Sequence, residues 1–373
     1  MKDFRWLEIT AWIKLLLCCA IVLVALAVQA NGFDAPVKSL ARFADYNGRV
    51  DWSWAQNKIA VDKLGSDGWY GIYTVSSDGA NEVNLTRSCP IGEHKHKGNP
   101  AWHPSGQYVV FQGQNDFKSP VGQKLWDYLA NPGIGVNCDL WLTDANGEKF
   151  WLLHKVPERI GGVLHPHFSH RGDRLLWAER IARSPGKWGQ WCLKVADFRI
   201  VSNQPMLTNI VTLQPGSQHV MYESHGWTAD DRAIIFSGNL EPGQKESAGD
   251  IYRYDLASGQ LSNLTQTMDE WDEHAQVSPS GKKIVWMTSK GYKLPDNPNH
   301  VQTDFWMMNL DGSEKKRLTF FNEPGHAEYL GKTYAIAGDS SWNADGTCLA
   351  ALVILDTQKG TACNYLIHFN SPQ

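Results

Sequence analysis

The sequence predicts an all-β fold, specifically a six-bladed β-propeller of four-stranded blades. One motif recurs six times, with a large apolar residue, then a polar turn, then an alternating apolar strand. The large apolar residues are Trp52, Trp102, Phe168, Trp227, Val277 and Trp342, spaced 50 to 66 residues apart. That spacing suits a four-stranded blade with some long loops. A second repeat and a way of closing the ring, described next, complete the prediction.

Each copy of the first motif is the start of a blade. The clearest copies are NPAWHPSGQYVVF (99–111), HPHFSHRGDRLLW (165–177), SHGWTADDRAIIF (224–236), HAQVSPSGKKIVW (274–286) and DSSWNADGTCLAA (339–351), with a degenerate copy at 51–61. A second hairpin follows in most units, at 71–86, 139–154, 250–265 and 304–319, with glycine in its turn. The tryptophans of the first motif are interpreted as core residues.

The last unit ends before its fourth strand, whereas residues 37–43 (VKSLARF) precede the first unit without a partner. We therefore expect this N-terminal segment to supply the outer strand of the last blade. Such closure leaves only short, protected strand edges. The prediction is one propeller domain over residues 31–373.

Residues 1–30 are predicted to be an export signal. Lys2, Arg5 and Lys14 precede an apolar run at 15–28, and small residues follow up to Ala30, after which cleavage is expected. The alternative is an uncleaved membrane anchor within residues 9–30. Both alternatives place the remaining chain outside the cytoplasm, in the periplasm or secreted.

The net charge is −4, which argues against a nucleic-acid partner. Five cysteines follow the signal, and an odd number cannot all pair with one another. Disulfides Cys348–Cys363 and Cys89–Cys138 are open alternatives to buried free thiols.

The repeats resemble the PD40, or WD40-like, repeats of the TolB family of propellers, whose consensus runs P-A-W-S-P-D-G before an apolar strand. The resemblance covers nearly all of residues 37–370 and implies the fold. TolB carries an additional α/β domain before its propeller, so the resemblance does not extend to its role with partner proteins. Similar repeats precede the hydrolase domain of prolyl-oligopeptidase-like peptidases, but the G-x-S-x-G nucleophile motif is absent from this sequence.

We expect the functional face to be the one that carries the long loops, at 112–137, 180–190, 237–249, 288–303 and 320–338. Polar residues at the starts of the inner strands approach this face around the axis. The predicted ligand-binding residues are Asn99, His165, His167, His225, His274 and Asp339. Of the histidines elsewhere, His103 and His170 are set aside, because their turns should lie on the opposite rim.

Imidazole, amide and carboxylate groups around one axis suit a divalent metal, so the candidate ligands are His165, His225, His274 and Gln276. No cofactor is required by the sequence, and the metals considered are Mn, Zn and Ca. A more distant resemblance to oligogalacturonate lyase, a seven-bladed propeller that holds manganese through histidines and a glutamine, implies the same kind of site.

Three functions remain open. The first is a propeller that binds a protein or glycan ligand in the periplasm or at the cell envelope through its long-looped face. The second is a metal-dependent carbohydrate lyase of the oligogalacturonate-lyase type that uses the axial histidines. The third is an accessory subunit of a membrane-associated complex, held by an uncleaved anchor. Whether the chain is an enzyme is left open, because the sequence offers no unique catalytic base.

Overall fold

The computed structural model describes residues 36–46, 48–118, 122–183, 189–217, 221–245, 247–295 and 297–373. The predicted export signal at 1–30 lies outside these residues. Among the residues described, none forms a helix long and apolar enough to cross a membrane.

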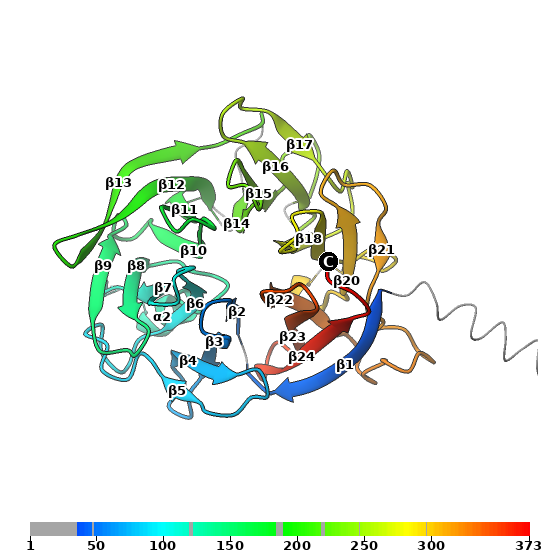
Figure 1. Cartoon of the computed structure of the whole chain (residues 1–373), viewed down its shortest axis with the longest axis horizontal. Helices are drawn as coiled ribbons and strands as arrows, with labels where there is room; N and C mark the ends of the chain where they lie inside the picture. Colours follow the sequence, from blue (N-terminus) through cyan, green and yellow to red (C-terminus); the bar gives the residue numbers. More distant parts are fainter. Residues whose placement is uncertain are drawn as a thin grey trace, which may run out of the picture.

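Six four-stranded antiparallel sheets form a ring, with their first strands around its centre (Figure 1). Blade one consists of β2 (Val50–Ser53), β3 (Lys58–Leu64), β4 (Tyr70–Ser76) and β5 (Val83–Asn84). Blade two consists of β6 (Lys97–Trp102), β7 (Tyr108–Gln114), β8 (Cys138–Asp144) and β9 (Phe150–His154). Blade three consists of β10 (Gly162–Phe168), β11 (Arg174–Ala182), β12 (Gln190–Val201) and β13 (Gln204–Leu213).

The other three blades continue the ring. Blade four consists of β14 (Tyr222–Trp227), β15 (Ala233–Gly238), β16 (Asp250–Asp255) and β17 (Leu261–Asn263). Blade five consists of β18 (Asp272–Val277), β19 (Lys283–Thr288), β20 (Asp304–Asn309) and β21 (Lys316–Arg317). Blade six consists of β22 (Ile336–Trp342), β23 (Cys348–Asp356), β24 (Thr361–Phe369) and the N-terminal β1 (Val37–Ala44). The loops add helix α2 (Gln123–Leu129) and the short 3-10 helix η1 (Pro298–His300).

The predicted six-bladed propeller is confirmed, and so is its closure. β1 pairs antiparallel with β24, from Val37 opposite Phe369 to Ala44 opposite Asn364. The two ends of the described chain therefore pair in one sheet. This pairing gives blade six its fourth strand and closes the ring.

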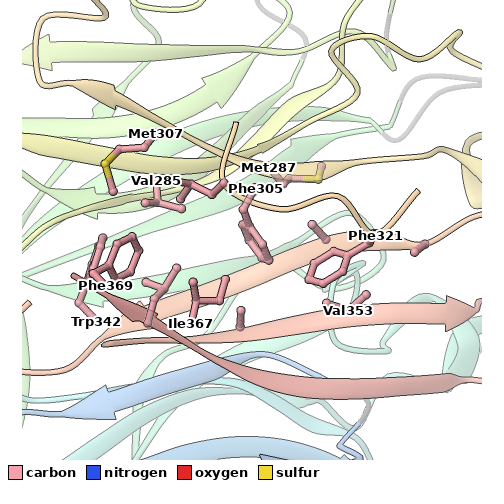
Figure 2. Packing of buried hydrophobic residues seen from close by; sticks show 14 of the residues in the cluster. Val285, Met287, Phe305, Met307, Phe321, Trp342, Val353, Ile367 and Phe369 are labelled. Carbon is pink, nitrogen blue, oxygen red and sulfur yellow. The ribbon is translucent and has the colours of Figure 1, made fainter. Parts of the chain in front are cut away.

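The hydrophobic core lies between adjacent blades. Between blades five and six, Val285, Met287 and Phe305 pack against Trp342 and Ile367 (Figure 2). The prediction that the large apolar residue of each motif is a core residue is confirmed for five blades, since Trp52, Trp102, Phe168, Trp227 and Trp342 are buried. Burying this apolar area between neighbouring blades stabilises the ring.

A buried aspartate opens the third strand of several blades and fastens the fourth. Asp250 accepts hydrogen bonds from the hydroxyls of Thr265 and Thr267 and from the Thr267 backbone N–H. Asp304 does the same for the Thr319 hydroxyl and the Phe321 N–H in blade five. These contacts explain the recurring aspartate and threonine at the two ends of the second hairpin, because buried donors must be satisfied.

The five cysteines within the described residues are all free and buried, namely Cys89, Cys138, Cys192, Cys348 and Cys363. The alternative of buried thiols is therefore the one the structure adopts, and neither disulfide forms. Cys348 lies in β23 opposite His368, and Cys363 in β24 lies opposite Val353, so the two are several residues apart along their ladder. Disulfide bonding needs close Cβ atoms.

Candidate metal centre

The site lies where the inner strands bulge. In blades two to six, the register between the first and second strands shifts a few residues before the large apolar residue of the motif. The shift lies between Gly98 and Ala101 in blade two, for example, and between Leu164 and His167 in blade three. Asn99, His165 and His274 sit in these bulges with φ of 51°, 46° and 53°. Such left-handed backbone is uncommon outside glycine, and bulges re-aim side chains, here toward the axis.

The bulges bring four potential metal ligands together. His165 on β10, Glu223 and His225 on β14, and His274 on β18 each offer one ligand atom, and these atoms lie within 4.8 Å of one another. His165 and His225 are 1% and 2% exposed. The rings of His165 and His274 stack with centroids 5.4 Å apart. Three of these residues were predicted from the sequence, and the predicted convergence of strand starts from three successive blades is what the geometry provides.

Two ring nitrogens in this cluster are buried without a hydrogen-bond partner among the described residues, His165 Nδ1 and His274 Nδ1. Each instead lies near a carboxylate: His165 Nδ1 is 3.1 Å from Glu223 Oε1, and His274 Nδ1 is 3.3 Å from Asp339 Oδ1. Buried polar atoms without good hydrogen bonds are costly. Imidazole nitrogens and carboxylate oxygens gathered this closely are also the donor atoms that a bound cation would share after the nitrogens lose their protons.

Arg49 completes the ring of first strands. It lies three residues before Trp52, at the blade-one counterpart of His165, and its side chain is 3% exposed. Its Nε is 3.6 Å from Asp339 Oδ1, and its Nη2 is 2.7 Å from His167 Nε2. Sequence reasoning missed Arg49, although counting three residues back from Trp52 as in the other blades would have found it. Glu223, the residue just before the blade-four position, was likewise not predicted as a ligand.

The pKa of His274 is shifted in the opposite direction from those of the other three axial histidines. Burial, reinforced by the positive charge of Arg49, lowers the pKa of His167, and burial lowers the pKa of His165 despite the nearby Asp339. Burial also lowers the pKa of His225. For His274, burial is outweighed by the charge of Asp339 and by Glu223 and Glu273, which raise its pKa to about 9. Neutral imidazoles are the form that binds metal, so a metal bound here would have to displace the proton of His274.

The carboxyl groups also differ from one another. Burial, together with the charge of Glu273, raises the pKa of Glu223 well above its usual range. Burial would do the same to Asp339, but His274, His165 and Arg49 hold its pKa well below that range. A cation bound beside Glu223 would favour its ionised form, because an opposite charge nearby stabilises the carboxylate.

The remaining predicted residues have identified partners. Asn99 donates to Gln112 Oε1 through its side chain and to Asp62 Oδ2 through its backbone, which ties it into blades one and two. Gln276 donates to the backbone oxygen of His225 at 3.3 Å. His225 Nε2 is 2.8 Å from the Ser237 hydroxyl, a contact that fixes the ring, as partners of metal-bound histidines do.

A cavity of about 150 Å³ adjoins the site on the side of the tight turns. His167, His225 and Gln276 line it, together with the large apolar residues of the six motifs. His103 and His170, set aside on the sequence because their turns lie on that rim, line it as well. Both are held by the protein, His103 Nε2 at 3.0 Å from Gly172 O and His170 Nδ1 at 2.9 Å from Asp231 Oδ1. Of the axial histidines, His167 and His225 therefore border space on the short-looped side.

Comparison with known proteins agrees with the fold. No protein-family model matches the chain. Dipeptidyl-peptidase 5 of Porphyromonas endodontalis is 28% identical over 240 residues, 60% of this chain and 33% of the relative. Its counterpart in Porphyromonas gingivalis is 21% identical over 239 residues, 60% of this chain and 34% of the relative. The chain thus spans about a third of the length of these curated relatives.

Among solved structures, a putative TolB from Agrobacterium tumefaciens superposes with a TM-score of 0.50 at 14% identity, covering 88% of this chain and 91% of that one. Oligogalacturonate lyase in complex with manganese gives a TM-score of 0.48 at 11% identity, covering 90% of this chain and 94% of that one. The chain therefore has the fold of the TolB-like β-propellers, the class that the repeats predicted.

Proposed function

We propose that this propeller binds a divalent transition metal on its axis, through His165, His225, His274 and Glu223. The observation that supports the proposal is the convergence of these four donors within 4.8 Å, in a buried place where His165 Nδ1 and His274 Nδ1 face carboxylates at 3.1 and 3.3 Å. Three imidazoles and one carboxylate suit zinc or manganese. Calcium, which takes oxygen ligands, fits this donor set poorly.

Metal analysis of the purified protein tests the site. We expect about one equivalent of zinc or manganese in the wild type and its loss in His165→Ala/His274→Ala. The matched control is His94→Ala/His326→Ala, which removes two exposed histidines. Saturating metal at about 100 times its Kd should stabilise the wild type by about 2.7 kcal/mol in thermal unfolding. Metal at background level in the wild type, or full occupancy in the His165/His274 variant, would contradict the proposal.

A second function, carbohydrate lyase activity, is favoured by Arg49. Its Nη1 is buried without a hydrogen-bond partner among the described residues, while its Nη2 lies 2.7 Å from His167 Nε2. A uronate substrate needs a cation to dock its carboxylate, a metal to stabilise the enolate and a base to remove the α proton. In this scheme Arg49 docks the carboxylate. Metal-loaded protein should form an unsaturated product from polygalacturonate, and Arg49→Leu should abolish it, whereas inactivity of the metal-loaded wild type would reject this second function.

Peptide hydrolysis, which the names of the two relatives suggest, is not proposed, because these 373 residues contain no G-x-S-x-G motif. Export is proposed on the strength of residues 1–30. N-terminal sequencing of the exported protein checks it: a start at Asn31 supports cleavage, and an intact N-terminus supports the membrane anchor and an accessory role in a membrane-associated complex.

A further inference from the structure

A groove lies far from the axis, between the outer parts of blades two and three. Its volume is about 670 Å³, within the range of ligand clefts. Tyr108 and Trp151 of blade two line one side, with ring centroids 5.9 Å apart in an edge-to-face arrangement. Both rings are half-buried, so part of their surface is open to the groove.

The other side of the groove is made by an unusually long hairpin. β12 and β13 of blade three have 12 and 10 residues, whereas the outer strands β5, β17 and β21 have only two or three. Figure 1 shows this hairpin reaching outward beside β9. Its turn, Ser202 and Asn203, has φ of 52° and 62°, the tight type that suits a hairpin. Because of this extension, Asn203 and Gln204 line the same groove as Tyr108 and Trp151.

The chemistry of the lining is that of a surface for hydroxyl groups. Gln107, Asn203 and Gln204 are exposed amides that can both donate and accept hydrogen bonds. The charged residues of the lining are Asp144 and Lys149, of opposite sign. Aromatic rings offer flat apolar faces that can pack on the C–H face of a sugar ring. A strongly charged ligand would meet no net complementary charge here.

We propose that this groove binds a neutral glycan chain, with Trp151 and Tyr108 as the stacking platform and Asn203 and Gln204 as hydrogen-bonding partners. The groove lies apart from the axial donors, shares no residue with them and does not depend on bound metal. A peptide is the less suitable ligand, because the charged residues of the lining are one pair of opposite sign, Asp144 and Lys149, and not a cluster of one charge that would dock a charged peptide group. The lining presents side-chain amides and rings instead.

Native gel electrophoresis through gels that contain a soluble neutral polysaccharide tests this proposal. The probes are a mixed-linkage β-glucan, a galactomannan and an arabinoxylan. We expect at least one to retard the wild type, with affinity about tenfold weaker in Asn203→Ala/Gln204→Ala, equivalent to about 1.4 kcal/mol. Trp151→Ala should weaken binding as well. Because loss of a half-buried ring also affects folding, the Asn203→Ala/Gln204→Ala variant, which changes exposed side chains, tests the same groove independently. Asn81→Ala/Gln260→Ala, in the corresponding turns of blades one and four, is the matched control and should bind as the wild type does.

Several results would overturn the proposal. One is that no polysaccharide retards the wild type, and another is that the Asn203/Gln204 variant is retarded equally. Retention of peptides from a casein digest by the wild type, lost in the same variant, would assign the groove to a peptide. Metal-depleted protein should be retarded as strongly as metal-loaded protein, so failure of the metal site and failure of the groove are distinguishable.

Discussion

Removing the buried arginine of the axial cluster should destabilise the fold strongly. Arg49 is 3% exposed in its side chain and forms an ion pair with Asp339, which is 12% exposed. Arg49→Ala leaves that carboxylate buried, and breaking a buried pair from one side costs about 3 to 5 kcal/mol. We expect the lower part of this range, because His274 Nδ1 still lies 3.3 Å from Asp339 Oδ1.

Urea denaturation of metal-free protein, followed by tryptophan fluorescence, measures this loss. The matched control is Arg42→Ala, whose guanidinium forms an ion pair with Asp45 at the surface, with side chains 52% and 65% exposed. Exposed pairs contribute about 0 to 1 kcal/mol, so this variant should unfold almost as the wild type does. The double variant Arg49→Leu/Asp339→Leu should regain part of the stability, since both charges are absent. Equal, small losses for Arg49→Ala and Arg42→Ala would refute the reasoning.

Three further outcomes are expected. Asp250→Ala should lower the free energy of unfolding by about 3 kcal/mol, because several buried donors, including those of Thr265 and Thr267, lose their acceptor; chemical denaturation measures the loss, and a change below about 1 kcal/mol would contradict it. Burial raises the pKa of Asp62 to about 7 despite its hydrogen bond from Asn99, so the folded protein binds this proton more tightly than the unfolded chain does, and this one carboxyl should contribute a fall in the free energy of unfolding as pH rises from about 4 to about 7. Asp62→Asn should make that fall smaller, and an unchanged pH profile would argue against the assignment. A thiol reagent should modify none of the five buried cysteines in native protein and all five in denaturant; a native signal from any of them would show that its blade opens.

Parts of the site were predictable because the repeat fixes where each residue sits. A residue three positions before the large apolar residue must start the inner strand, so His165, His274 and Asp339 could be placed around the axis without coordinates. The repeat could not show that the backbone bulges there with positive φ, since alternation along a strand predicts only which face a side chain takes. The bulge decides that His165 and His274 stack and that Glu223 joins them.

The same limit explains why the sequence pointed neither to Arg49 nor to the groove at the outer rim. Arg49 lies just before the degenerate first copy of the motif at 51–61, whose match to the other copies is weakest. The groove at the outer rim depends on how far the β12–β13 hairpin extends, and on which residues of blade two lie under its turn. Strand length is poorly specified by an alternating pattern, and the groove is lined by residues that are distant in sequence, such as Trp151 and Asn203.

The sequence by itself determined the number of blades, their order and the closure of the ring by residues 37–43, because these follow from local repeats and from one unpaired strand. It also determined which histidines start inner strands. Only the tertiary structure decided that these side chains converge within 4.8 Å, that all five cysteines stay free, and that Arg49 is buried against Asp339. Those outcomes depend on distances between blades, set by packing of the core between them rather than by any single stretch of sequence.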